Sequence, residues 1–124
     1  MKHLHTFEDF LNESSELEKF RKLALRQLKS SKMGEKIKRD VESLVGKSAV
    51  EGVYIIGSVL EPKKFTEESD IDIAVMINVP DMKKGSNEEM SYEFSQTYAL
   101  PDAGFVDITI WNITKPLGEM IKIA

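Results

Sequence analysis

Residues 53–77 read Val-Tyr-Ile-Ile-Gly-Ser-Val-Leu-Glu-Pro-Lys-Lys-Phe-Thr-Glu-Glu-Ser-Asp-Ile-Asp-Ile-Ala-Val-Met-Ile. The stretch begins and ends with apolar runs rich in β-branched residues, which are typical of buried strands, and the polar segment between them predicts a loop or one helical turn. Asp70 and Asp72 stand at the start of the second run. Because residues i and i+2 of a strand point to the same face, these two carboxylates should project together, while Ile71 and Ile73 face the core.

The paired acids favour a divalent metal site. A carboxylate in an apolar environment must be paired or must bind a metal, and two carboxylates side by side repel each other until a cation relieves the repulsion. Hard oxygen ligands of this kind suit Mg²⁺ or Mn²⁺. The alternative is an ordinary polar turn before a strand.

A third acid, Asp107, lies in the apolar stretch Gly104–Trp111, which predicts another strand. If the strands of Asp72 and Asp107 are neighbours, the third carboxylate should lie beside the first two; the alternative is a surface acid at a sheet edge. Three carboxylates from two strands could hold two divalent ions, which clamp the attacking and leaving oxygens of an in-line phosphoryl displacement. Asp70, Asp72 and Asp107 are therefore the candidate catalytic residues and metal ligands.

The turn after the first apolar run is suited to holding a phosphate. Gly57 has no side chain, so the backbone can approach a ligand closely. Ser58 offers a hydroxyl group and, with the residues after it, backbone N–H groups. Such a turn is a weak signal by itself, but it gains weight from the acids that follow one loop later.

Helical patterns surround the strands. The N-terminal part predicts a helical turn after Thr6, an interruption at residues 12–15, a helix that begins with a capping box at Ser15 and Glu18, and a helix at Glu35–Val45. Strands are predicted at Val53–Ile56, Ile71–Val79 and Gly104–Trp111. A helix at 87–99, capped by Ser86 and Glu89, has a strand as its alternative, and a short helix is predicted at Leu117–Ile123. This order predicts a small α/β or α+β fold, with helices packed on a mixed sheet of three or more strands. We expect one domain over residues 1–124, helical at 1–50 and with its sheet core at 53–124. Tyr54, Phe105 and Trp111 are expected in the core.

The length and composition of the chain exclude several classes of protein. The chain has 124 residues, of which 41% are hydrophobic and 31% charged, and this is enough for one modest core. No apolar run reaches the length that crosses a bilayer, and the N-terminal residues are polar and acidic, unlike a secretory signal. The absence of cysteine excludes disulfides and thiolate metal sites. We therefore expect a cytoplasmic protein without a membrane partner.

Charge is unevenly distributed along the chain. The formal net charge is -4, yet residues 19–47 carry ten basic and only three acidic residues. A basic segment on an acidic protein could meet a nucleotide phosphate or a nucleic acid. The alternative is a solvated helix face, which we favour because charge-rich helices commonly present one.

Three motifs together resemble a known family. Ile-Ile-Gly-Ser, Ser-Asp-Ile-Asp-Ile-Ala-Val and Phe-Val-Asp-Ile are similar to motifs of the minimal nucleotidyltransferase domain of the DNA polymerase β-like superfamily, over the part of the chain that follows Val53. The resemblance implies a nucleotidyltransferase-like fold and transfer of a nucleoside monophosphate from an NTP to a hydroxyl acceptor, with Mg²⁺ or Mn²⁺ as the cofactor.

The resemblance also implies roles for single residues. Gly57 and Ser58 would hold the triphosphate, with Ser69 grouped among the nucleotide-binding residues. Asp70 and Asp72 would ligate both metals, and Asp107 would complete the catalytic metal site and help to activate the acceptor hydroxyl. The family often carries an Arg-Gly pair shortly after Gly-Ser. Here that stretch is Val-Leu-Glu-Pro, so Lys63 or Lys64 would have to serve the phosphates.

Two other functions remain open at this stage. Proteins that resemble this one can be antitoxins, so the chain could bind a partner such as a toxin, with weak or no catalytic activity. It could also bind nucleic acid through the basic segment, although that segment contains a single aromatic residue for base stacking. The acceptor could be a small molecule, a nucleic acid or a protein, and a homodimer or a complex with another protein is plausible for so short a chain.

Overall fold

A computed structural model of the chain describes residues 7–100 and 104–124, with side chains from Glu16 onward; the turn expected after Thr6 therefore begins outside the described residues. The helices are α1 (Phe7–Ser30), α2 (Met33–Val45) and α3 (Glu88–Thr97), with 3₁₀ turns at Lys47–Ala49 and Ser58–Leu60. The strands are β1 (Val50–Ile56), β2 (Ile71–Ile77), β3 (Gly85–Asn87), β4 (Ala99–Leu100), β5 (Gly104–Asn112) and β6 (Ile121–Lys122).

The strands form one mixed sheet. Their order is β3-β5-β2-β1-β6, and β4 also pairs with β5. Strands β2 and β5 run parallel, which requires the crossover through α3, and the other pairs are antiparallel. The predicted α+β fold, with helices packed on a mixed sheet, is confirmed.

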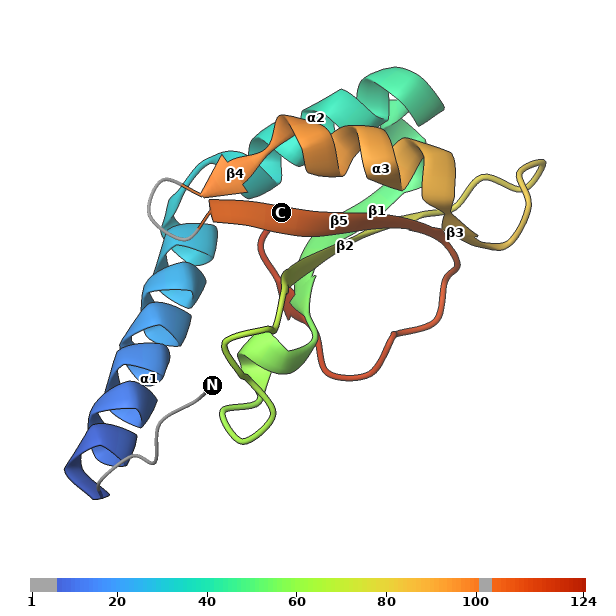
Figure 1. Cartoon of the computed structure of the whole chain (residues 1–124). Coiled ribbons are helices and arrows are strands. Elements are labelled where there is room, and N and C mark those ends of the chain that lie inside the picture. Colours follow the sequence, from blue (N-terminus) through green and yellow to red (C-terminus); the bar gives the residue numbers. More distant parts are fainter. Residues whose placement is uncertain (1–6, 101–103) are drawn as a thin grey trace.

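The helices are gathered on one side of the sheet. Helices α2 and α3 lie along one face, and α1 runs past one end of the sheet and extends beyond it (Figure 1). On the opposite side, the segment 113–120 leaves β5 and returns to the edge of β1 as β6 (Figure 1). The face of the sheet that the helices do not cover is therefore crossed by this segment, which we call the strap.

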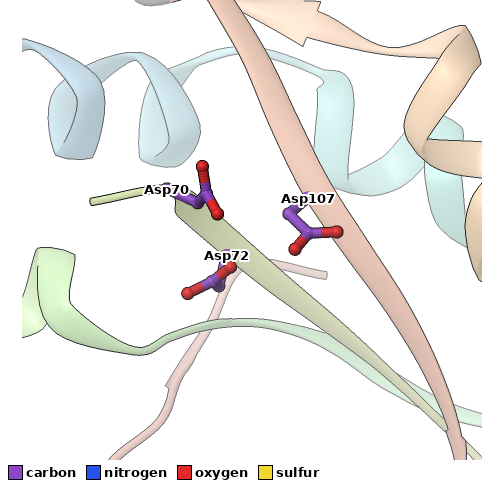
Figure 2. Close-up of side chains that lie close together, drawn as sticks. All are labelled: Asp70, Asp72 and Asp107. Atoms are coloured by element: carbon purple, nitrogen blue, oxygen red, sulfur yellow. The ribbon is translucent and has the colours of Figure 1, made fainter. Parts of the chain in front are cut away.

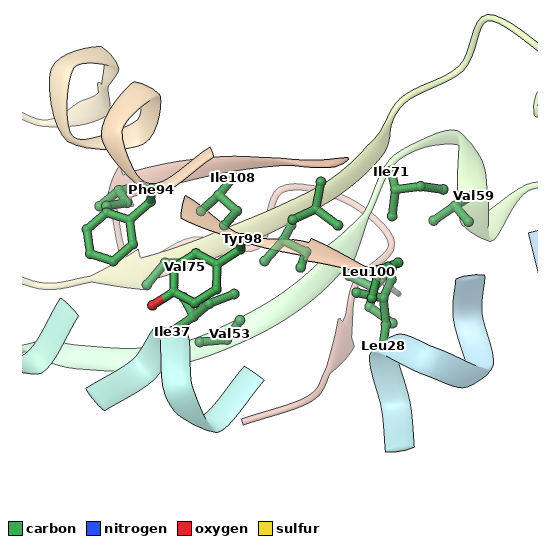
Figure 3. Close-up of a cluster of buried hydrophobic side chains, with 14 of the residues drawn as sticks. Leu28, Ile37, Val53, Val59, Ile71, Val75, Phe94, Tyr98, Leu100 and Ile108 are labelled. Atoms are coloured by element: carbon green, nitrogen blue, oxygen red, sulfur yellow. The ribbon is translucent and has the colours of Figure 1, made fainter. Parts of the chain in front are cut away.

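Strand β2 supplies the centre of the hydrophobic core. Its alternate residues Ile71, Ile73, Val75 and Ile77 are at most 3% exposed. They pack with buried side chains from neighbouring strands and from the helices, among them Leu28, Ile37, Val53, Phe94 and Ile108 (Figure 3). Burial of this kind stabilises the fold by roughly 25 cal/mol for each Å² of apolar surface removed from water.

Helix α1 corrects the expected organisation of the N-terminal part. It runs without a break from Phe7 to Ser30, so the interruption at residues 12–15 and the helix start at Ser15 are wrong. Glu18, the expected partner in a capping box, pairs instead with Arg21 inside the helix. Polar residues of this kind lower helix propensity by only a few tenths of a kcal/mol each, which does not suffice to end a helix without a glycine or a proline.

The short helix expected at Leu117–Ile123 is also wrong. Gly118 has a φ of 103°, which is incompatible with a helix. Ile121 and Lys122 form β6 instead, opposite Ile55 and Tyr54 of β1. The backbone groups along the edge of β1 need hydrogen-bond partners, and this long-range pairing decides the local structure.

Helix α3 is present where a helix was expected, but its cap differs. The side chain of Asn87 accepts a hydrogen bond from the backbone N–H of Met90 at 3.1 Å, so the capping box of Ser86 and Glu89 is wrong. The sequence does not predict β3 and β4, because strands of two or three residues are too short to show an alternating pattern.

The aromatic residues expected in the core divide between burial and exposure. Tyr54 and Trp111 are partly buried, whereas the expectation for Phe105 is wrong, since it is 79% exposed.

None of the described helices combines the length and the apolar composition that a membrane span requires.

Candidate metal centre

Three carboxylates converge where β2 and β5 begin to pair. Asp72 lies directly opposite Asp107 in the parallel register, and Asp70 precedes the first residue of β2. One carboxylate oxygen of each residue lies within 4.8 Å of the others (Figure 2). The condition that the sequence left open, that the strands of Asp72 and Asp107 are neighbours, is therefore met.

The electrostatics of this cluster are unfavourable without a cation. Burial, and then the nearby charges of Asp107 and Asp70, raise the pKa of Asp72 from 3.8 to about 6. Among the described residues, no base forms an ion pair with any of the three carboxylates. A set of hard oxygen ligands with uncompensated negative charge fits Mg²⁺ or Mn²⁺.

Gly57 lies directly against the carboxylate of Asp72. Its φ is 83°, and a Cβ placed on it would lie 2.5 Å from Oδ2 of Asp72. Only glycine satisfies both the backbone conformation and the close approach. The carbonyl oxygen of Gly57 then accepts a hydrogen bond from the N–H of Leu60 at 3.1 Å, which starts the 3₁₀ turn at Ser58–Leu60.

Arg21 fixes this turn from the side of α1. Its Nη1 donates to the carbonyl oxygen of Val59 at 2.9 Å, and its Nε and Nη2 donate to the carboxylate of Glu18. Arg21 is only 8% exposed, so the solvated helix face expected for residues 19–47 is wrong at this position. Its place on the apolar side of the helix, four residues after Leu17 and three before Ala24, is the sequence signal that identifies it.

The other nucleotide-binding candidates are placed differently. The hydroxyl oxygen of Ser69 accepts a hydrogen bond from the N–H of Thr66 at 2.8 Å, so it closes the turn before Asp70. Lys63 is exposed, and Lys64 pairs with Glu61 at 3.4 Å in a solvated position. In the described part of the chain, neither lysine makes an ion pair with the carboxylate cluster.

Helix α3 holds β5, the strand that carries Asp107, through two serines. The Oγ of Ser95 accepts from the N–H of Ile108 at 2.8 Å and lies 3.1 Å from the carbonyl oxygen of the same residue. The Oγ of Ser91 accepts from the N–H of Ile110 at 2.8 Å. The Oγ of Ser95 also lies 3.5 Å from Oδ1 of Asp107, at the limit of a hydrogen bond. These contacts hold β5 in place, and no sequence motif indicates them.

Two adjoining hollows open beside Asp107. The first, of about 350 Å³, is lined by Asp70, Ser95, Gln96, Phe105, Val106 and Asp107. The second, of about 490 Å³, shares Ser95, Gln96 and Asp107 and extends along α3 to Tyr92 and Trp111. Acids line both hollows, and none of their described lining residues is basic.

Comparisons with protein-family models, with curated proteins and with solved structures found no match to this chain.

Proposed function

We propose that the protein is a metal-dependent nucleotidyltransferase that moves a nucleoside monophosphate from an NTP to a hydroxyl acceptor. The observation that carries this proposal is the convergence of Asp70, Asp72 and Asp107 from two neighbouring strands, with the turn at Gly57 packed against Asp72. Family-level resemblance of the three motifs agrees with this geometry.

The reaction assigns a task to each group. The acceptor oxygen bonds to the α-phosphorus, the bond from that phosphorus to the bridging oxygen breaks, and pyrophosphate leaves with the electron pair. Divalent ions held by the carboxylates would neutralise charge on the phosphates and lower the pKa of the acceptor hydroxyl. Asp107 or solvent takes the hydroxyl proton. The turn at Gly57 and Ser58 offers a site for the phosphates next to Asp72.

The hollows beside Asp107 offer room for the acceptor. Their acidic lining disfavours an acceptor that carries phosphate, because like charges in a confined site repel each other. A neutral or cationic small molecule, or a hydroxyl side chain of a protein, fits this lining better than a nucleic acid.

The test is transfer of label from each of four α-³²P-NTPs to a component of a cell lysate, in the presence of Mg²⁺ or Mn²⁺. We expect transfer by the wild type and none by Asp70→Asn. The matched control is Asp81→Asn, which removes an exposed acid from a turn after β2 and should keep the activity. Absence of transfer with every NTP, or equal transfer by Asp70→Asn, would contradict the proposal.

A partner-binding protein without catalysis is the second candidate. Phe105, which is 79% exposed, lines the first of the two hollows, and Tyr92, which is 68% exposed, lines the second. Exposed aromatic residues of this kind are enriched at protein interfaces. If binding is the only function, Asp107→Asn should leave a complex with the partner intact, whereas Phe105→Ala should weaken it. Size-exclusion chromatography of the purified complex measures both effects.

A further inference from the structure

A third hollow lies on the other side of the metal centre, between the sheet and the strap. Its volume is about 410 Å³, and its walls include Glu51, Tyr54, Met76, Pro116 and Met120. The register of β1 and β2 pairs Ile56 with Asp72, Tyr54 with Ala74 and Gly52 with Met76. Residues directly opposite each other in a sheet share a face, so this hollow lies on the same face as Asp72.

The ring of Tyr54 lies over the backbone of Gly52. A Cβ placed on Gly52 would lie 3.0 Å from Cε2 and Oη of Tyr54 and from Cε of Lys122, so the ring and the lysine side chain together occupy the space that a side chain at residue 52 would fill. Tyr54 is partly exposed, and Met76 lies across from Gly52. An aromatic ring and a thioether on the sheet, opposite Pro116 and Met120 of the strap, make an apolar slot suited to a planar ring.

Glu51 gives the slot one charged group. The pairing of β1 with β2 steps from Val50 opposite Ile77 to Gly52 opposite Met76, which leaves Glu51 as the extra residue of a β-bulge. A bulge redirects the side chain that it carries, and this exposed carboxylate lines the hollow. A carboxylate is an acceptor only, so it selects a ligand with N–H donors.

The distance from the metal centre to the slot matches the length of a nucleotide. Met76 follows Asp72 by four residues, which is about 13 Å along a strand, and Tyr54 lies opposite the midpoint of that interval. A nucleotide whose α-phosphate lies at Asp72 would extend its ribose and base, two rings in series, over a comparable length. Ile56 and Tyr54, both partly exposed, lie along this line.

We propose that the slot between Tyr54 and the strap binds the base of the NTP, and that Glu51 favours a purine that presents an amino group. This inference rests on the proposed function, since it requires the triphosphate at the carboxylate cluster. It places the nucleotide on the β1 side of Asp72 and leaves the β5 side, next to Asp107, to the acceptor.

The experiment separates the base from the phosphates. Isothermal titration calorimetry of the full chain measures the affinities for Mn²⁺-tripolyphosphate and for Mn²⁺-ATP, Mn²⁺-GTP and Mn²⁺-UTP. The ratio of the affinity for an NTP to that for tripolyphosphate is the gain that the nucleoside contributes. We expect a purine NTP to bind about fivefold or more tightly than tripolyphosphate, because stacking of aromatic rings contributes about 1 kcal/mol. Tyr54→Ala should remove most of this gain and leave the binding of tripolyphosphate unchanged.

The matched control is Leu44→Ala, which removes an exposed apolar side chain on α2, away from the three hollows, and should keep the additional affinity for purine NTPs. Glu51→Gln, a change at an exposed side chain, should reduce the preference for ATP over purine riboside triphosphate, which lacks the amino group, even if Tyr54→Ala fails to fold. Equal affinities for tripolyphosphate and purine NTPs, or an unchanged gain in Tyr54→Ala, would overturn the inference while the proposed function stands. Binding of neither ligand would overturn both.

Discussion

The two faces of β2 carry different kinds of side chain. Toward the helices it presents four branched aliphatic residues, all at most 3% exposed. Toward the strap it presents Asp72, Ala74 and Met76: a charged, a small and a flexible side chain. One strand therefore serves stability on one face and a candidate site on the other, and substitutions should affect the two separately.

The largest expected effect is on the helix-facing side. Ile73→Ala removes a side chain that is 0% exposed, and we expect the free energy of unfolding to fall by about 2–5 kcal/mol. Denaturant unfolding measures the change, and Tyr92→Ala should alter stability by less than about 0.5 kcal/mol. A loss below about 1 kcal/mol for Ile73→Ala would mean that this face is not the core.

The next largest effect is expected at Gly57, where one substitution should change both the stability of the fold and the candidate metal site. Gly57→Ala should cost about 1–2 kcal/mol because of the positive φ, and it should also displace the carboxylate of Asp72. We therefore expect Mn²⁺ to raise the Tm of the wild type and to leave the Tm of Gly57→Ala unchanged. Gly46→Ala is the matched control, since Gly46 has a φ of 101° and nothing within 4 Å of an added Cβ. It should lose similar backbone stability and keep the response to Mn²⁺.

A smaller effect concerns the charge of Asp72. Its pKa of about 6 in the folded protein lies above the ordinary 3.8, so the folded state favours the protonated form. Stability should therefore be lowest above pH 6 and should rise as the pH falls from about 6 to about 4. Allowing for solvent screening at a half-buried group, we expect a rise of about 1–2 kcal/mol from this residue.

Asp72→Asn should be more stable than the wild type at pH 7.5 in EDTA, and the difference should vanish near pH 4. Urea unfolding at a series of pH values measures it. With Mn²⁺ in excess, the order should reverse, because a metal that binds only the native state stabilises the wild type alone. If Asp72→Asn were less stable than the wild type in EDTA at pH 7.5, the charge of Asp72 would not destabilise the folded state as we expect.

The smallest effect is expected in the loop between β1 and β2. Replacing both Lys63 and Lys64 by alanine should change stability by less than about 0.5 kcal/mol, since the Lys64–Glu61 pair is solvated. If these lysines serve the phosphates, the affinity for Mn²⁺-tripolyphosphate should fall severalfold at low salt and less at high salt. An unchanged affinity at low salt would remove them from the site.

The carboxylate cluster could be predicted from the sequence in large part. Alternation along β2 places Asp70 and Asp72 together, and the apolar run around Asp107 identifies a strand. What the sequence could not supply was the pairing partner of each strand, because register depends on contacts between residues far apart in the chain. Only the structure shows that Asp72 and Asp107 lie opposite each other.

Long-range contacts also explain two of the remaining differences. The position of Arg21 on the apolar side of α1 indicates that it is buried, but its partner, the carbonyl oxygen of Val59, lies 38 positions away in the chain and is not predictable from the sequence. The segment at Leu117–Ile123 resembles a helix locally and becomes β6 because β1 needs a neighbour. Phe105 shares a strand face with Asp107 and Thr109, whereas Val106 and Ile108 form the apolar face, so the alternation in this run indicates that Phe105 faces solvent and the expectation of a core residue overlooked it.

The serines of α3 have a consequence for how the molecule behaves at high concentration. The pairing of β5 with β3 ends at Ile110 and its pairing with β4 ends at Phe105; the backbone N–H of Ile110, at the end of the first pairing, donates to the hydroxyl of Ser91, and that of Ile108, between the two pairings, donates to the hydroxyl of Ser95. Unpaired backbone groups on an outer strand are a template for edge-to-edge aggregation. The two hydroxyls occupy these groups as a further strand would, and so they protect the fold from adding a strand of another chain at this edge.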